Sequence, residues 1–128
     1  MSNELTMLAY SGLVVLLIIL VHVLLAAASV GLAPLAGPRD DALDLSTGAA
    51  RMKRAADNAI HALALFAPAV LILNAQGVST TGTIMAAQIF LIVRILHPVI
   101  YYLGIPWLRT LVWLCGFLAT AWLYLQAL

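Results

Sequence analysis

The stretch RMKRAADNAIHALALF, from Arg51 to Phe66, decides the fold of this chain. It begins with basic residues and continues into an apolar segment that reaches Leu73, with no Pro or Gly before Pro68, so the whole run can form one helix. Four of its polar residues lie three, four and three positions apart: Arg51, Arg54, Asn58 and His61. This spacing places them on one helical face. Polar groups on a helix that enters a membrane face the bundle interior or a watery cavity, and they usually mark a functional site.

The composition predicts an integral membrane protein. Of the 128 residues, 65% are hydrophobic and 9% are charged, and the mean hydropathy is +1.10. A soluble domain is about 45–50% apolar and about 25% charged. The net charge of +1 comes from a few basic residues at helix ends or inside the membrane, so we expect no nucleic-acid partner. The length indicates a single domain over residues 1–128.

The helix signals predict an all-α fold with four membrane-spanning helices, at about residues 5–32, 47–75, 82–103 and 106–127. Gly31 and Pro34 should end the first helix, and Ser46 or Thr47 should cap the second. The remaining boundary signals are Gly77, Gly104 and Pro106. We expect the connection over residues 33–48 to be a loop with a charged cluster of Arg39, Asp40, Asp41 and Asp44. Four such spans make an antiparallel bundle.

The positions of Lys and Arg predict the orientation. Basic residues flank the first connection and follow the third span, whereas the second connection and both ends of the chain have none; the flanking residues are Arg39, Arg51, Lys53, Arg54 and Arg109. The positive-inside rule therefore places the basic connections in the cytoplasm and both termini on the non-cytoplasmic side.

A second polar stripe lies in the third span, IFLIVRILHPVIYYLG, where Arg94, His97 and Tyr101 are three and four residues apart. An arginine at a helix centre costs at least about 2.5–3.5 kcal/mol on insertion scales. The predicted spans offer Arg94 no carboxylate inside the membrane. We therefore expect its partner to be a bound anion or a group of a neighbouring protomer.

Together the two stripes and Arg109 bring four guanidiniums to the cytoplasmic half of the bundle, which is typical of an anion site because guanidinium binds carboxylate in a bidentate manner. Simpler interpretations remain. The basic residues at 51–54 also suit lipid phosphates, and tyrosines at 101–102 also suit the interface belt. We expect His22 to be a buried imidazole bonded to backbone and Cys115 to be a small apolar filler.

Two motifs resemble the signatures of the membrane-associated proteins in eicosanoid and glutathione metabolism (MAPEG), in a small bacterial-type member. RxxRAxxN followed by Leu65–Phe66 resembles the signature of the second helix, and R-I-x-H-x-x-x-Y over residues 94–101 resembles that of the third. The arginine that follows within about two turns corresponds to Arg109. The resemblance covers nearly the whole chain.

The resemblance implies a homotrimer of four-helix protomers in a membrane, here the bacterial inner membrane. It also implies that glutathione binds as a co-substrate near the cytosolic face, between protomers, and attacks a lipophilic electrophile as in a glutathione transferase or peroxidase. The residues that would line the glutathione site are Arg51, Arg54, Asn58, His61, Arg94, His97 and Tyr101. Arg109 would be catalytic by stabilising the thiolate, and no metal is implied.

The chain departs from the family pattern at two positions. Ala50 stands where the family often has Glu, and His61 stands where it has a Glu expected to bind the amine of the tripeptide. An imidazole does not supply the negative charge of a carboxylate. Two alternatives to an enzyme follow. One is a non-catalytic protein of the same fold that binds a lipid or metabolite, and the other is a haem-carrying membrane anchor with His61 and His97 as ligands.

Overall fold

The computed structural model describes residues 2–39 and 42–128, in which all regular structure is helical. Four long helices are α1 (Asn3–Val30), α3 (Thr47–Gln76), α4 (Thr81–Leu103) and α5 (Pro106–Ala127), and each is long and apolar enough to cross a membrane. Their limits lie within two residues of the predicted ones. The all-α, four-span fold class is therefore confirmed.

The predicted boundary signals act locally, as expected. The Ser46 hydroxyl accepts a hydrogen bond from the Ala49 N–H and caps α3. Gly77 and Gly104 end α3 and α4 at φ values of 70° and 75°, in the left-handed region that favours glycine. Pro106 opens α5, where its missing N–H costs no helical hydrogen bond.

The connection after α1 differs from the prediction. The first helix ends at Val30 rather than near residue 32, because Gly31 takes a φ of 83°. A short helix, α2 (Leu32–Ala36), follows where a loop was expected. Pro34 lies inside α2 instead of stopping α1, which suits a first-turn position that needs no N–H donor. Asp40 and Asp41 of the predicted charged cluster lie outside the described residues.

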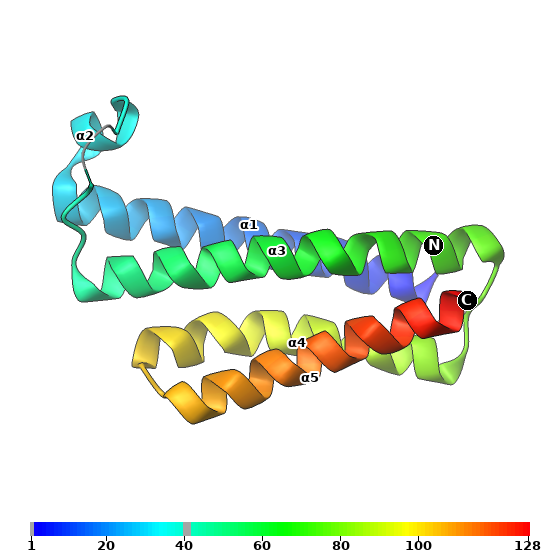
Figure 1. Cartoon of the computed structure of the whole chain (residues 1–128). Coiled ribbons are helices and arrows are strands. Elements are labelled where there is room, and N and C mark those ends of the chain that lie inside the picture. Colours follow the sequence, from blue (N-terminus) through cyan, green and yellow to red (C-terminus); the bar gives the residue numbers. More distant parts are fainter. Residues whose placement is uncertain (1, 40–41) are drawn as a thin grey trace.

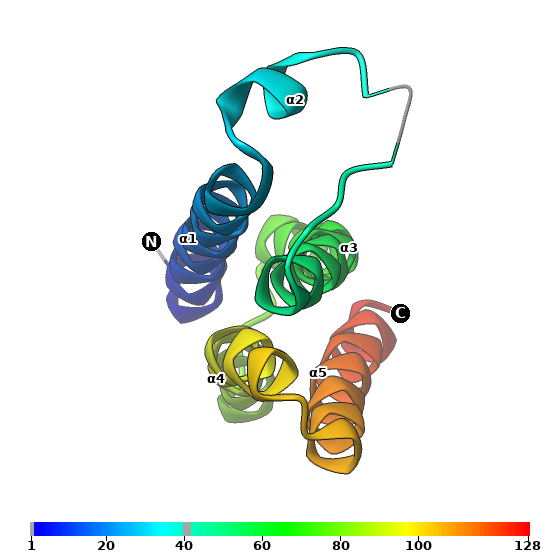
Figure 2. The same ribbon diagram turned by 90° about the vertical axis from the view of Figure 1, so that its left-hand side faces the viewer.

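The four long helices form an antiparallel bundle (Figure 1). Seen along the bundle, α1 packs against α3 and α4, and α5 packs against α4 and α3 (Figure 2). Both ends of the described chain lie at one end of the bundle, and α2 with the α4–α5 connection lies at the other. Five of the six basic residues belong to this second end: Arg39, Arg51, Lys53, Arg54 and Arg109.

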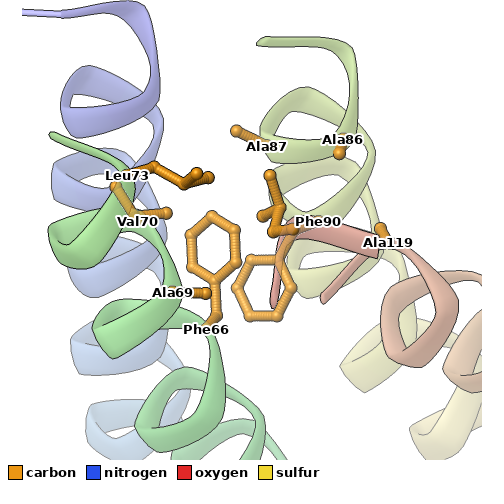
Figure 3. Packing of buried hydrophobic residues seen from close by; sticks show 9 residues of the cluster. Phe66, Ala69, Val70, Leu73, Ala86, Ala87, Phe90 and Ala119 are labelled. Carbon is orange, nitrogen blue, oxygen red and sulfur yellow. The ribbon is translucent and has the colours of Figure 1, made fainter. Parts of the chain in front are cut away.

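The main core joins α3, α4 and α5 in the half of the bundle nearer the termini (Figure 3). The rings of Phe66 and Phe90 stack with centroids 3.8 Å apart and planes within 5°. Small side chains around them allow the helices to approach closely, and two of these, Ala69 and Ala87, are fully buried. This contact fixes how α3 and α4 face each other, and therefore how their polar stripes meet.

The end of the bundle that carries both termini has a buried carboxylate. Glu4 is 2% exposed, and it accepts hydrogen bonds from the hydroxyls of Thr83 (2.7 Å) and Ser79 (2.9 Å). Glu4 pairs with these hydroxyls and not with Arg94, whose hydrogen-bond partner among the described residues is Asn58. Glu4 lies at the N-terminus of α4, where the helix dipole and hydroxyl donors stabilise a negative charge. It ties α1 to α4 at the end opposite the arginines.

We predict that Glu4→Ala lowers stability by about 1.5–3 kcal/mol, the usual contribution of hydrogen bonds to a charged group. The physical reason is that the buried Thr83 hydroxyl loses its charged acceptor and keeps only the neutral Thr80 carbonyl. Thermal unfolding in detergent measures the change. Asn3→Ala is the matched control, because Asn3 is its exposed neighbour in the same turn. Equal unfolding temperatures for the two variants would contradict the prediction.

Candidate functional site

Four of the predicted site residues meet at the basic end of the bundle. They line a pocket of about 160 Å³, hereafter the rim pocket, together with the α4–α5 connection: Arg51, Arg54, Tyr101, Gly104, Ile105, Pro106 and Arg109. Two of the three arginines that line this pocket contact Tyr101. Arg54 Nε donates a hydrogen bond to the Tyr101 hydroxyl (3.0 Å), and the Arg109 guanidinium lies 4.7 Å from the Tyr101 ring centroid. That distance suits a cation–π contact, which holds Arg109 against the ring face.

Arg51 has a structural partner as well as a place in the pocket. Its Nη1 donates to the Tyr102 carbonyl at the C-terminus of α4 (3.1 Å), where a cation is favoured by the helix dipole. The neighbouring Gly104 leaves room for it, since a Cβ at that position would lie 2.9 Å from Arg51 Nη1. Arg51 therefore fixes the first turns of α3 to the end of α4.

Three other predicted residues, Asn58, His61 and Arg94, line a second and larger pocket of about 470 Å³, hereafter the side pocket. Its wall is mostly apolar and aromatic and comes from α3, α4 and α5. The remaining lining residues are Ala62, Leu65, Phe90, Trp113, Gly116, Phe117, Thr120, Ala121 and Tyr124. On α3, Asn58 is the lining residue closest to the rim pocket, because it lies one turn beyond Arg54.

Arg94 is 1% exposed, so the protomer alone buries it. Its Nη1 donates to Asn58 Oδ1 over a long 3.4 Å, and its guanidinium lies 5.4 Å from the Phe90 ring centroid. Its Nε is buried and has no hydrogen-bond partner in residues 2–39 and 42–128. The sequence did not identify Asn58 as a partner across the helices. A neutral amide and an aromatic ring leave the charge of Arg94 only partly compensated.

Along α4, His97 lies between Arg94 of the side pocket and Tyr101 of the rim pocket, and it lines neither pocket. It is 2% exposed, its ring centroid is 5.7 Å from that of Tyr101, and its Nδ1 has no partner within the described chain. His61, by contrast, is exposed and lines the side pocket. The two histidines therefore do not share a cavity, which gives no support to a haem held between them. The described residues contain no group of three or more His, Cys, Asp or Glu side chains placed to hold a metal.

Both pockets are formed by the same three helices, so they follow each other along one face of the bundle. On α5, Trp113 of the side pocket lies one turn beyond Arg109 of the rim pocket. A ligand in the rim pocket meets guanidiniums and a phenol, and a ligand in the side pocket meets aromatic carbon. The predicted site residues are thus divided between a cationic rim pocket and a mostly apolar side pocket that also contains Arg94.

Two expectations outside this face are wrong. Cys115 is exposed rather than an interior filler, and it lines an outer groove between α4 and α5. His22 is half-buried, and its Nδ1 lacks the predicted backbone partner among the residues described. Both errors concern which side of a nearly uniform apolar helix faces inward, which the sequence pattern does not specify there.

The comparisons agree with the architecture. The model of the MAPEG family matches residues 7–128, nearly the whole chain. No curated protein and no solved structure matches it.

We predict that Gly104→Ala destabilises the rim pocket. A left-handed φ costs a non-glycine residue about 1–2 kcal/mol, and the added methyl would meet the Arg51 guanidinium. The unfolding temperature in detergent should fall. Gly12→Ala is the control, because nothing lies within 4 Å of its Cβ position and alanine favours a helix by about 1 kcal/mol. A variant at residue 104 as stable as the one at residue 12 would contradict this account.

Proposed function

The chain belongs to the MAPEG family, and we propose on this premise that it is a membrane enzyme that binds glutathione at the rim pocket and transfers it to a lipophilic electrophile. The observation that carries the proposal is the adjacency of the two pockets. A water-soluble anionic thiol needs the cationic rim pocket, and a lipid-phase substrate needs the apolar side pocket. Lining residues of the two pockets lie one turn apart on α3 (Arg54 and Asn58) and on α5 (Arg109 and Trp113), so the sulfur and the electrophile would meet at this junction.

Arg109 is the proposed catalytic residue. Its guanidinium is held over the Tyr101 ring, at the side of the rim pocket that leads to Trp113. A cation beside a thiol favours the thiolate, which is the nucleophile. The thiol proton is released to solvent, the sulfur forms a bond to the electrophilic carbon, and the electrons of the broken bond leave with the displaced group or opened oxygen. In a peroxidase reaction the same thiolate would attack a peroxide oxygen, the O–O bond would break and the alkoxide would leave as the alcohol after taking a proton from solvent. A second glutathione thiol would then displace water from the sulfenic acid to give the disulfide.

The other predicted residues would hold the ligand. Arg54 keeps N–H donors beyond the one given to Tyr101, and Arg51 keeps donors beyond the one given to Tyr102. Asn58, His61 and Arg94 would contact whatever reaches the junction. His97 would act through Tyr101, whose ring it contacts, rather than by touching the ligand.

A homotrimer is part of the proposal. The rim pocket of one protomer, about 160 Å³, is smaller than the roughly 300–1,000 Å³ of ligand pockets in general. A neighbouring protomer would supply the missing wall, and it would also cover part of the exposed apolar surface beside the side pocket, including Trp113 and Phe117. The positive-inside rule and the five basic residues at one end support cytoplasmic rim pockets, with both termini outside, in a bacterial inner membrane.

For the assembly, we expect a mass of three chains per particle in mild detergent, by native mass spectrometry or light scattering. The reason is the incomplete rim pocket of the single protomer. A stable monomer that still bound glutathione would contradict the shared site.

For the chemistry, we predict that Arg109→Leu lowers kcat about a hundredfold, as loss of an electrostatic stabiliser does, while the glutathione Kd changes less than tenfold. Glutathione titration, thiolate absorbance and turnover would be measured together. Lys53→Leu is the control. It removes one cation from the same end of the bundle, but Lys53 is exposed, pairs with Asp57 and lines neither pocket.

Equal losses in binding and turnover would make Arg109 a binding residue only. Glutathione binding without turnover of any electrophile or peroxide would favour the non-catalytic alternative. Absence of glutathione binding would contradict the proposed function itself.

A further inference from the structure

The rim pocket gathers three guanidiniums, those of Arg51, Arg54 and Arg109, and no carboxylate lines it. The acid closest to them in sequence is Asp57, three positions beyond Arg54. Asp57 pairs with Lys53 at 3.5 Å and lines neither pocket. None of the three arginines forms an ion pair with a residue that the structure describes. Three positive charges around one small space favour a ligand group with more than one negative charge.

Most of the N–H donors in the rim pocket are unused. An arginine has five N–H groups, and Arg51 donates one of them to the Tyr102 carbonyl. Arg54 donates one to the Tyr101 hydroxyl, which keeps its own proton free to donate. A phosphomonoester has a charge of about −1.5 to −2 at pH 7 and three acceptor oxygens. It would therefore use these donors more fully than a carboxylate, which has one charge and two oxygens.

The size of the rim pocket suits one polar group of a larger ligand. The part that one protomer forms, about 160 Å³, is below the roughly 300–1,000 Å³ of pockets that hold a whole ligand. The space that follows along the same helices is the mostly apolar side pocket of about 470 Å³. On α5, Trp113 lies four positions beyond Arg109, about 6 Å along the helix axis. A three-carbon glycerol unit would span this step between the pockets.

The side pocket becomes less polar with distance from the rim pocket. On α3 and α4, the lining residues closest to the rim pocket along the chain are Asn58 and Arg94. Arg94 has a long 3.4 Å bond to Asn58 Oδ1 and a buried Nε without a partner in the described chain, so this end has donors left for a carbonyl oxygen. At the far end, the Tyr124 hydroxyl donates to the Leu65 carbonyl and offers no free proton. That end therefore suits hydrocarbon.

The position of the rim pocket in the membrane follows from an exposed tryptophan. Trp107 is 83% exposed and comes directly after Pro106, which lines the rim pocket. Tryptophan side chains at the end of a membrane-spanning helix lie at the level of the lipid headgroups. This indicates that the rim pocket lies at headgroup level, and that the side pocket, further along the same helices, lies beside acyl chains.

We propose that the rim and side pockets together bind a single-chain phosphomonoester lipid, with its phosphate among the guanidiniums of the rim pocket and its acyl chain in the side pocket. The ligand is a lipid rather than a free phosphate, because an apolar pocket adjoins the cationic one. Its ester carbonyl would accept from Asn58 or Arg94. The inference goes beyond the proposed function, and no step of its test uses glutathione. A bound lipid of this kind would exclude glutathione from the rim pocket.

The test compares four ligands on the intact assembly in mild detergent, by titration with native mass spectrometry. The ligands are oleoyl lysophosphatidic acid, oleoyl lysophosphatidylcholine, oleic acid and glycerol phosphate. Lysophosphatidic acid should bind at least tenfold more tightly than each of the others, because it alone has both a phosphomonoester and an acyl chain. Lysophosphatidylcholine has the same chain, but its phosphate is a diester beside a cationic choline.

Variants locate the phosphate. Arg54→Gln and Arg109→Gln should each weaken the binding of lysophosphatidic acid about ten- to a hundredfold, as the loss of a charged hydrogen bond does, and leave the binding of lysophosphatidylcholine unchanged. Lys53→Gln is the matched control. It removes one cation from the same end of the bundle, but Lys53 lines neither pocket, so the affinity should stay at the wild-type value.

Each contrary outcome overturns a stated part of the proposal. Equal binding of the two lysolipids, or of oleic acid, would mean that the phosphomonoester is not recognised. Glycerol phosphate that bound as tightly as the lipid would make this a site for free phosphate esters. A loss in Lys53→Gln as large as in the arginine variants would assign the effect to the charge of the whole bundle end. If an arginine variant does not fold, the wild-type ranking of the four ligands decides the proposal.

Discussion

The buried guanidinium of Arg94 is the constraint on which the functional half of the bundle depends. It lies among three helices at 1% exposure, with an amide oxygen at 3.4 Å and an aromatic ring as its only described partners. A charge in this position persists only if the surrounding helices hold its few partners in place. The stack of Phe66 on Phe90 does so, because it fixes α3 against α4 one turn from Arg94. Gly116 then lets α5 approach Val93 closely enough to close the side pocket.

Much of this arrangement follows from local sequence. Helix boundaries were predictable because Ser46, Gly77 and Gly104 act on their own turns, through a cap or a left-handed φ. The two polar stripes were predictable because the three- and four-residue spacing fixes a helical face whatever it packs against. The same two stripes also predicted the family of the chain, and the family match over residues 7–128 confirms this prediction. The assignment of ligand contacts to individual residues remains a prediction.

The rest depends on contacts between distant segments, which spacing does not encode. In the sequence, Glu4 looks like any acid in the first turn of a helix. Only the packing of α1 brings its carboxylate to the hydroxyls of Ser79 and Thr83, which are 75 and 79 residues away in the chain. Arg51 looked like a ligand residue, but the C-terminus of α4 uses one of its donors. The division into a rim pocket and a side pocket arises from the aromatic side chains of α5, which carry no polar signal in the sequence. The short helix α2 was missed because a glycine and a proline three residues apart, Gly31 and Pro34, usually mark a loop.

The placement of the acids also bears on how the bundle balances its charge. Glu4 accepts a hydrogen bond from Thr83 at the N-terminus of α4, and Asp57 pairs with Lys53. Both carboxylates therefore interact with groups outside the two pockets. The guanidiniums of the site are instead held by neutral groups: a phenol, a carbonyl and an amide. Neutral acceptors orient a cation without cancelling its field, whereas a carboxylate would do both. The site therefore keeps a positive electrostatic potential that no carboxylate cancels, and an anionic ligand that approaches the basic end of the bundle would be attracted by it.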